Sequence, residues 1–195
     1  MIVIYIILGI VVVLLIWGIF MYNRFVAFVN NTKEAWADID VQLKRRYDLI
    51  PNLVETVKGY ASHEKETLDA VVEARAKATS TQVDASNITA EQIQAFEGAE
   101  QGLTSALSRL MAISENYPDL KANQNFLELQ RELSDTENKI QAARRFYNSN
   151  VRQLATALQQ FPGNVIGKMF NFTSMEFFEL SEDEQAAKDP VKVQF

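Results

Sequence analysis

The side chains that most enzymes use for catalysis are scarce in this chain. His63 is the only histidine and cysteine is absent, which excludes thiolate catalysis, zinc bound by cysteines and a metal site built from several histidines of one chain. His63 stands before Glu64 without the second histidine of a zinc-protease helix. We interpret it as a solvated histidine on a helix face beside Glu64 and Glu66, and we expect no catalytic residue, no metal ligand and no cofactor.

Two carboxylates close in sequence, Asp38 and Asp40, are a candidate acid-base or metal-binding pair. Two residues apart on a helix, their side chains diverge by about 200°, so they cannot converge on one proton or metal ion without a second helix. The sequence contains no phosphate-binding loop, dinucleotide-binding glycine pattern or calcium-binding loop. We therefore rank a hydrolase whose site is composed of distant carboxylates below two non-catalytic functions.

Lys44, Arg45 and Arg46 form a basic cluster that two kinds of partner could neutralise. One is anionic lipid, but on a straight helix Lys44 lies roughly 33 Å beyond Tyr22, whereas charges in solution are screened over about 8 Å. The other is a set of acidic side chains on adjacent helices or protomers, and we favour this second partner. Candidates are Asp135 and Glu137, which lie upstream of Arg144 and Arg145.

Composition and charge restrict the remaining classes of function. The chain has 195 residues and a net charge of -6, which argues against nucleic-acid binding because a phosphate-tracking surface needs a basic stripe. Residues 1–23 contain no Asp, Glu, Lys or Arg. We therefore divide the chain into an anchor (1–23), a helical domain (24–180) and an acidic tail (181–195) that we expect to be flexible.

The uncharged leader contains an unbroken apolar run from Ile2 to Tyr22. As a helix this run covers roughly 30 Å, the thickness of the hydrocarbon core of a bilayer. A cleaved signal peptide is disfavoured, because no basic residue precedes the run and bulky residues stand where a cleavage site needs small ones. We predict a single uncleaved membrane anchor, with Trp17 and Tyr22 at its far interface. Its residues include Ile2, Leu8, Leu14, Trp17, Phe20 and Tyr22.

The basic residues beside the anchor predict its orientation. The N-terminal side offers only the α-amino group, whereas Arg24 and Lys33 follow the apolar run closely. Because basic flanks stay on the cytoplasmic side of a membrane, the helical domain is expected in the cytoplasm.

Apolar residues recur at helical spacing from Phe25 to Arg75, which indicates one long helix that packs against neighbours in a bundle. Pro51 falls inside this run and allows two interpretations. Asp48 could cap a new helix with Pro51 in its first turn, or the helix could continue with a kink. We prefer the continuous helix because the apolar spacing keeps its phase across Pro51.

The following segments predict further helices and no strands. Residues 78–87 are small and polar and predict a loop. Thr89 and Gln92 match a capping box for a second helix that ends before Pro118. A third helical pattern runs over residues 120–158, and no alternating strand pattern occurs. The sequence thus predicts an all-α fold in which an N-terminal transmembrane helix continues into an elongated antiparallel helical bundle.

Apolar and aromatic residues are concentrated again in residues 165–180. Thr173 and Glu176 match another capping box and could begin a short helix. We consider this segment a contact surface between protomers or at the end of the bundle, and packing within the chain is an equally good interpretation. The candidate contact residues are Val165, Ile166, Met169, Phe170, Phe172, Phe177 and Phe178.

Two blocks of this sequence resemble the LemA family. The first is the run EAWADIDVQLKRRYDLIPNLV at 34–54, followed by KGY at 58–60 and EKETL at 64–68; the second comprises RRFYN at 144–148, FPGN at 161–164 and FF at 177–178. The similarity covers roughly residues 2–180, and the tail after Leu180 falls outside it. The resemblance implies a bacterial single-pass membrane protein with a mostly cytoplasmic α-helical domain and no established enzymatic activity.

Two functions compete ahead of the composite hydrolase. The first choice is a membrane-anchored scaffold, without catalysis, that self-associates into a homo-oligomer through its long helices. The alternative is an adaptor that binds an unidentified membrane protein of another system, such as proteolysis or envelope maintenance. Both place the chain in the bacterial cell membrane, with the lipid bilayer as the partner of the N-terminal helix.

Overall fold

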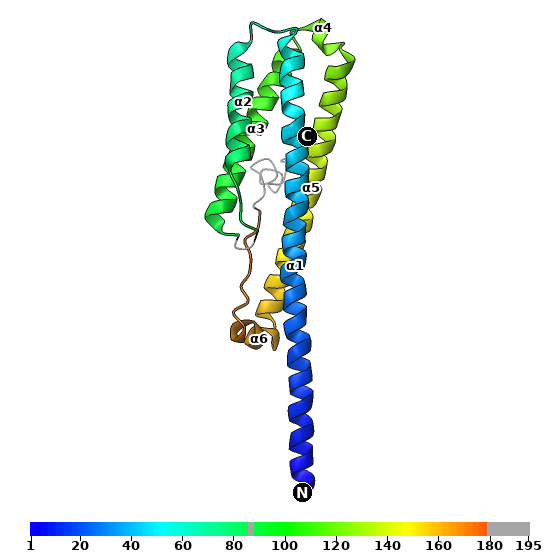
Figure 1. Cartoon of the computed structure of the whole chain (residues 1–195), viewed down its shortest axis with the longest axis vertical. Coiled ribbons are helices and arrows are strands. Elements are labelled where there is room, and N and C mark those ends of the chain that lie inside the picture. Colours follow the sequence, from blue (N-terminus) through cyan, green and yellow to red (C-terminus); the bar gives the residue numbers. More distant parts are fainter. Residues whose placement is uncertain (86–87, 179–195) are drawn as a thin grey trace, which may run out of the picture.

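The described part of the chain is built from helices alone. The computed structural model describes residues 1–85 and 88–178, and these contain six α-helices and no β-strand (Figure 1). The predicted all-α fold is therefore confirmed. The helices are α1 (Ile2–Lys58), α2 (Lys65–Ser80), α3 (Ala90–Ser114), α4 (Pro118–Lys121), α5 (Gln124–Gln159) and α6 (Gly163–Met169).

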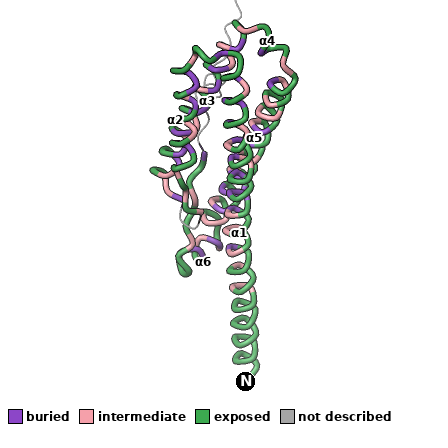
Figure 2. The backbone as a smooth tube through the Cα atoms, turned by 45° about the horizontal axis from the view of Figure 1, so that its top comes forward, coloured by how far each residue is buried: buried purple, intermediate pink, exposed green. Residues whose placement is uncertain are grey.

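The helix α1 joins the apolar leader to the bundle without interruption. It includes Pro51 within one helix of 57 residues, so the continuation of the helix through Pro51 is confirmed and the alternative of a new helix capped by Asp48 is wrong. Every residue from Met1 to Ile16 is exposed, and Figure 2 shows this part of α1 projecting beyond the rest of the molecule. Its length and hydropathy suffice to cross a membrane, and none of the most apolar window is buried.

The bundle is elongated because its long helices lie side by side. The helix α5 returns antiparallel along α1, and α2 and α3 form a second antiparallel pair (Figure 1). Three apolar clusters follow one another along α1: one around Phe25, one around Trp36 and one around Leu53. The α1 turns from Phe25 onward thus contribute to a core, whereas residues 1–16 contribute to none of these clusters.

The predicted single helix from Phe25 to Arg75 is wrong at one place. The helix α1 ends at Lys58, and α2 begins only at Lys65. Val57, Ala61 and Leu68 are all buried in the same core cluster, so the apolar spacing records a shared core and not a continuous backbone. His63 lies exposed in the intervening turn and not on a helix face.

The boundaries of the other helices differ locally from the prediction. The helix α2 extends to Ser80, inside the predicted loop, because Ala78 is buried in the core. The predicted third helix is divided, because the Asn123 side chain accepts a hydrogen bond from the backbone N–H of Phe126 (3.0 Å) and begins α5 there. The capping box of Thr89 and Gln92 is present as predicted.

The second predicted capping box is absent. Residues 173–178 are not helical, because side chains of α5 bind the backbone of this segment in place of helical hydrogen bonds. The Tyr147 hydroxyl donates to the Glu176 carbonyl (2.9 Å), and Asn148 binds the backbone of Phe178. The predicted tail at 181–195 lies outside the described residues.

Candidate functional site

A buried arginine connects three helices at the centre of the bundle. Arg46 of α1 is only 6% exposed. Its guanidinium lies 3.1 Å from the Glu100 carboxylate of α3 and 3.2 Å from the Glu137 carboxylate of α5. It also donates a hydrogen bond to the Thr104 hydroxyl (2.8 Å). Of the two expected kinds of partner, adjacent helices or adjacent protomers, the acidic side chains beside Arg46 come from adjacent helices of the same chain, and the candidate Glu137 is one of them.

Burial also changes the acidity of the groups beside Arg46. Desolvation raises the pKa of Glu100, although the hydrogen bond from Tyr47 and the charge of Arg46 oppose this shift. The Tyr47 hydroxyl donates to the other Glu100 oxygen, and burial together with Glu100 raises the pKa of Tyr47. Arg75 of α2 donates to the Tyr47 carbonyl (2.7 Å), so the network reaches all four long helices.

This network is suited to positioning helices and not to reacting with a substrate. The Arg46 guanidinium stays protonated, and both oxygens of Glu100 already accept hydrogen bonds from described side chains. Of the other two cluster residues, Arg45 pairs with Glu132 on the surface, and Lys44 is exposed beside a cavity. The basic cluster therefore divides into one buried residue and two exposed ones.

Three aromatic rings from distant parts of the chain surround Trp36. The Trp36 indole stacks on Phe178 with centroids 5.3 Å apart and an interplanar angle of 5°. Phe96 and Tyr147 contact Trp36 edge to face at 5.8 Å and 5.5 Å. The Arg144 side chain lies over the Phe178 ring, with its guanidinium carbon 4.6 Å from the ring centroid. Arg144 also forms an ion pair with the Glu97 carboxylate. The residues that carry the resemblance in both sequence blocks thus converge on one cluster.

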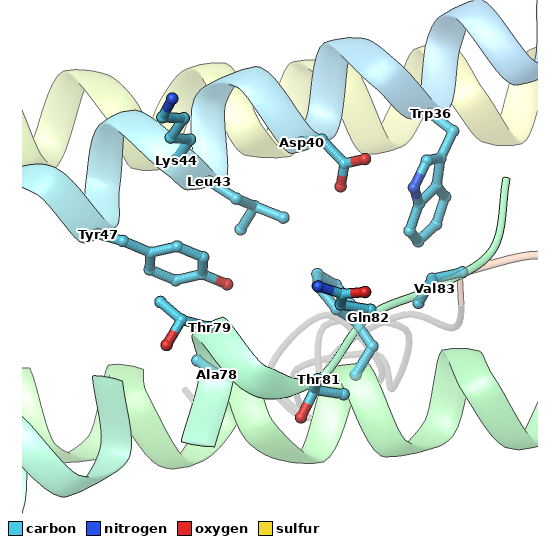
Figure 3. A pocket seen from close by; sticks show the side chains of 11 residues that line it. Trp36, Asp40, Leu43, Lys44, Tyr47, Ala78, Thr79, Thr81, Gln82 and Val83 are labelled. Carbon is cyan, nitrogen blue, oxygen red and sulfur yellow. The ribbon is translucent and has the colours of Figure 1, made fainter. Parts of the chain in front are cut away.

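A cavity of about 250 Å³ lies beside this cluster, between α1 and the segment that follows α2 (Figure 3). Trp36, Asp40, Tyr47 and Gln82 contribute polar atoms to its wall. Desolvation raises the pKa of Asp40, and the neighbouring Trp36 indole N–H opposes that shift. The buried Nε1 of Trp36 has no acceptor within hydrogen-bonding geometry among the described residues. This wall suits a small molecule, or a water molecule, that accepts a hydrogen bond from the Trp36 indole N–H and donates one to the Asp40 carboxylate.

The cavity walls carry no assembled catalytic set. Asp38 is exposed on another face of α1, so the structure does not bring it together with Asp40. Among the described residues, no group of three or more His, Asp or Glu side chains is arranged to hold a metal ion. The polar groups of the cavity can bind and orient a small molecule.

The candidate contact residues divide between the core and the surface. Ile166 is buried against Phe25 and Leu154, and Phe178 is buried against Trp36. Phe172 is half-buried and stacks on Phe25 at 5.2 Å. Val165, Met169, Phe170 and Phe177 are exposed. Packing within the chain therefore accounts for Ile166, Phe172 and Phe178, and it leaves the other four available for external contacts.

Of the predicted anchor residues, Ile2, Leu8 and Leu14 lie on the projecting part of α1, and Trp17, Phe20 and Tyr22 follow it. Ile2, Leu8, Leu14 and Phe20 are exposed, and no described residue packs over them. Trp17 is partly covered by the cluster around Phe25. Tyr22 contacts Phe170 edge to face at 4.8 Å, so the end of the apolar run already touches the bundle.

Sequence reasoning missed Glu100, although a signal for it was present. Apolar residues of α3 recur at Phe96, Leu103 and Leu107, and Glu100 occupies the intervening core position of this pattern. Arg46 likewise lies between Leu43 and Ile50 on the buried face of α1. A charged residue at a core position of two neighbouring helices predicts a buried ion pair.

Comparison with known proteins finds a LemA protein and magnetosome proteins among the relatives of this chain. The chain is 27% identical to Protein LemA of Metamycoplasma hominis over 169 residues, which is 86% of this chain and 73% of the relative. It is 24% identical to Magnetosome protein MamQ of Magnetospirillum gryphiswaldense, covering 80% of this chain. A MamQ of Paramagnetospirillum magneticum is similar to the same degree. The chain spans 64% of the length of these two magnetosome proteins.

Together with the projecting apolar helix, these relatives indicate a protein anchored at a membrane, and neither of their names denotes an enzymatic activity.

A family model described as the LemA family matches residues 35–195. This match continues past Leu180, so the expectation that the tail falls outside the family pattern is wrong. The match begins within α1, after the apolar run. It includes the residues that form the Arg46 network and the aromatic cluster around Trp36. The chain belongs to the LemA family.

Proposed function

We propose that this protein is a single-pass, membrane-anchored scaffold without intrinsic catalysis, which self-associates through its long helices. The observation that carries the proposal is the continuity of α1. One helix supplies both the exposed apolar run and the buried face that organises all three core clusters. Because no flexible linker separates the apolar run from the bundle, the position of the run in the bilayer also determines the position of the bundle.

The orientation of the proposed anchor follows from its flanks. Arg24 and Lys33 lie on the bundle side of the apolar run, and no charged side chain precedes the run. Because basic flanks are retained in the cytoplasm, these residues support a bundle on the cytoplasmic side. A reporter enzyme fused after Phe195 and assayed on each side of the membrane tests this placement, and activity of an externally restricted reporter would contradict it.

Exposed apolar side chains on the long helices support self-association. Val41 of α1 and Phe146 of α5 are exposed. On these two antiparallel helices both lie on the same side of the surface pair of Arg45 and Glu132, toward the end of the bundle from which the apolar run projects. Val41 lies one turn from Arg45 along α1, and Phe146 lies about four turns from Glu132 along α5 on a similar face. Single exposed apolar residues are common on protein surfaces. Val41 and Phe146, however, lie on one face of an elongated bundle, where they provide an interface for a second, parallel copy.

Two measurements test the scaffold. The first is the mass of the purified, detergent-solubilised chain by light scattering, for which we expect an oligomer; a monodisperse monomer at cellular concentration would remove the proposal. The second uses the absence of cysteine. We expect V41C and F146C to form intermolecular disulfides in membranes. The matched control is V72C on α2, which is exposed to a similar extent, and we expect little crosslinking there.

The adaptor remains the second candidate, and the exposed Phe177 beside the aromatic cluster favours it because this ring is available to another protein. A single foreign membrane protein that co-purifies in stoichiometric amount with the monomer, and is lost in Phe177→Glu, would favour the adaptor over the scaffold. Loss of a measured turnover on substitution of Asp40 or Glu100 would instead favour an enzyme.

A further inference from the structure

The membrane-proximal end of the bundle carries a second apolar surface besides the anchor. We define the α6 surface as the exposed side chains of Phe161, Val165, Met169 and Phe170. We propose that the α6 surface lies in the boundary between headgroups and acyl chains of the bilayer that α1 spans. This inference rests on the proposed membrane anchor and adds a second lipid contact to it.

The length of the exposed part of α1 places the bilayer next to α6. Ile2 to Ile16 is the stretch of the apolar run that no described residue covers, and as a helix it extends about 22 Å. The hydrocarbon core is about 30 Å thick, and any tilt of α1 reduces the vertical reach further. The remaining depth must be covered by the part of α1 from Trp17 to Tyr22, against which the end of the bundle packs.

Contacts between α1 and the segment around α6 fix the two at the same level. Tyr22 contacts Phe170 and Phe172 with ring centroids 4.8 Å and 5.5 Å away. A Cβ on Gly163, at the start of α6, would lie 3.3 Å from the Met21 methyl group and 3.4 Å from Phe25. Figure 1 shows α6 beside α1 at the end of the bundle, where only the leader projects farther. The α6 surface therefore lies at the depth of Met21 and Tyr22.

Large apolar side chains in and next to α6 are exposed at this depth. Phe161 is 82% exposed, Met169 66% and Val165 50%. On the neighbouring turns of α1, Ile19 and Phe20 are also exposed. An aqueous surface would leave these five large apolar groups at one end of the bundle in water, whereas the interfacial region of a bilayer accommodates them.

The charges around the α6 surface suit a bilayer with anionic headgroups. Arg24, Arg152 and Lys168 are exposed at this end of the bundle, and residues 1–33 and 153–175 contain no Asp or Glu. This is unusual for a chain with a net charge of -6. Long basic side chains place their stems along apolar surface and their charges among lipid phosphates. The combination of exposed apolar rings with basic residues alone is typical of segments that lie in the membrane interface.

A second contact changes what the anchor can do. A single helix leaves the bundle free to rotate about the axis of α1 and to tilt. An additional apolar contact on one side of α1 opposes both motions, because either would withdraw the α6 surface from the bilayer into water. We therefore infer that the bundle is held in one orientation relative to the membrane plane.

The test measures the lipid contact of single labelled positions in the full-length protein. Because the chain has no cysteine, V165C and M169C can each carry one environment-sensitive fluorophore. The proteins are reconstituted in vesicles of phosphatidylcholine and phosphatidylglycerol that contain a spin label either near the headgroup or deep in the acyl chain. We expect blue-shifted emission at both positions and stronger quenching by the shallow label than by the deep one.

Two control positions separate the failure of this inference from the failure of the anchor. L14C lies in the middle of the apolar run, and we expect quenching by the deep label; its absence would contradict the anchor itself. V72C on α2 is 53% exposed and matches Val165 in exposure, and we expect no quenching there. If L14C is quenched while V165C and M169C behave as V72C does, the α6 contact is refuted and the anchor stands. Blue-shifted emission without lipid quenching would assign the α6 surface to a second copy and would also refute the lipid contact.

Discussion

The indole of Trp36 and the ring of Phe178 are stacked with centroids 5.3 Å apart and planes inclined by only 5°. Because Trp36 belongs to α1 and Phe178 follows α6 by several residues, this contact connects the anchor helix to the returning end of the described chain. Both rings are almost fully buried. The contact explains why the segment after α6 lies along the bundle and does not form the helix that Thr173 and Glu176 predicted.

Removal of the Trp36 ring should destabilise the bundle strongly. We expect Trp36→Ala to lower the free energy of unfolding by about 3 to 5 kcal/mol, because it leaves a cavity among three aromatic partners. Urea unfolding of the detergent-solubilised chain, followed by circular dichroism, measures this change. Val72→Ala on the surface is the control, with an expected change within about 0.5 kcal/mol. Near-neutral stability of the Trp36 variant would mean that this ring is not core.

The adjacent arginines of α1 should differ in their effect on stability. Arg46→Ala leaves Glu100 buried without its cation, and we expect a loss of about 3 to 5 kcal/mol. Arg45→Ala removes a surface pair with Glu132, and we expect less than about 1 kcal/mol. The comparison uses the same substitution at neighbouring positions and the same unfolding assay. Equal losses would contradict the central role of the Arg46 network.

Glycine-to-alanine substitutions should have opposite signs in α6 and α3. A Cβ on Gly163 would lie 2.4 Å from the Ala157 carbonyl oxygen, so Gly163→Ala must displace α6 and is expected to cost about 1 to 3 kcal/mol. A Cβ on Gly98 would meet no atom within 4 Å, and Gly98→Ala should stabilise the helix by about 0.5 to 1 kcal/mol. Thermal unfolding of both variants measures the signs. A stabilising Gly163→Ala would show that α6 does not pack closely on α5.

The stability of the bundle should fall at alkaline pH through Tyr147. Burial, with a smaller contribution from Glu176, raises the pKa of this tyrosine above its usual value of 10.0. The unfolded chain therefore loses the proton first, and stability present below pH 10 is lost as the pH rises above it. We expect Tyr147→Phe to reduce this alkaline loss relative to the unsubstituted chain. Unfolding measured on both sides of pH 10 checks the slope, with Tyr60→Phe at an exposed position as the control; an unchanged slope in Tyr147→Phe would contradict the assignment.

A charge in the middle of the apolar run should oppose membrane insertion. Leu14→Arg is expected to disfavour insertion by about 3 kcal/mol, because Leu14 lies on the projecting, uncovered part of α1. The fraction of protein recovered with membranes measures this effect. Val41→Arg places the same charge on the exposed face of the bundle and should not change the fraction. Unchanged membrane recovery of Leu14→Arg would be incompatible with a lone anchor.

The helices were predictable because their signals are local. Thr89 and Gln92 formed the predicted cap because the capping box involves only neighbouring residues. The apolar spacing around Pro51 predicted a continuous α1, but the same criterion failed at Gly59, where the core continues through a turn. Periodicity reports which residues are buried together, and it does not report whether the backbone between them remains helical.

The sequence by itself determined an apolar run long enough to cross a bilayer, an all-α domain and membership of one family, because run length, spacing and motif residues are written in order along the chain. Only the tertiary structure decided that Arg46 is neutralised by Glu100 and Glu137, that Phe178 stacks on Trp36, and that α6 lies beside Tyr22. These pairings join residues far apart in sequence. They depend on the register of packed helices, which the sum of many side-chain contacts sets and no local pattern encodes.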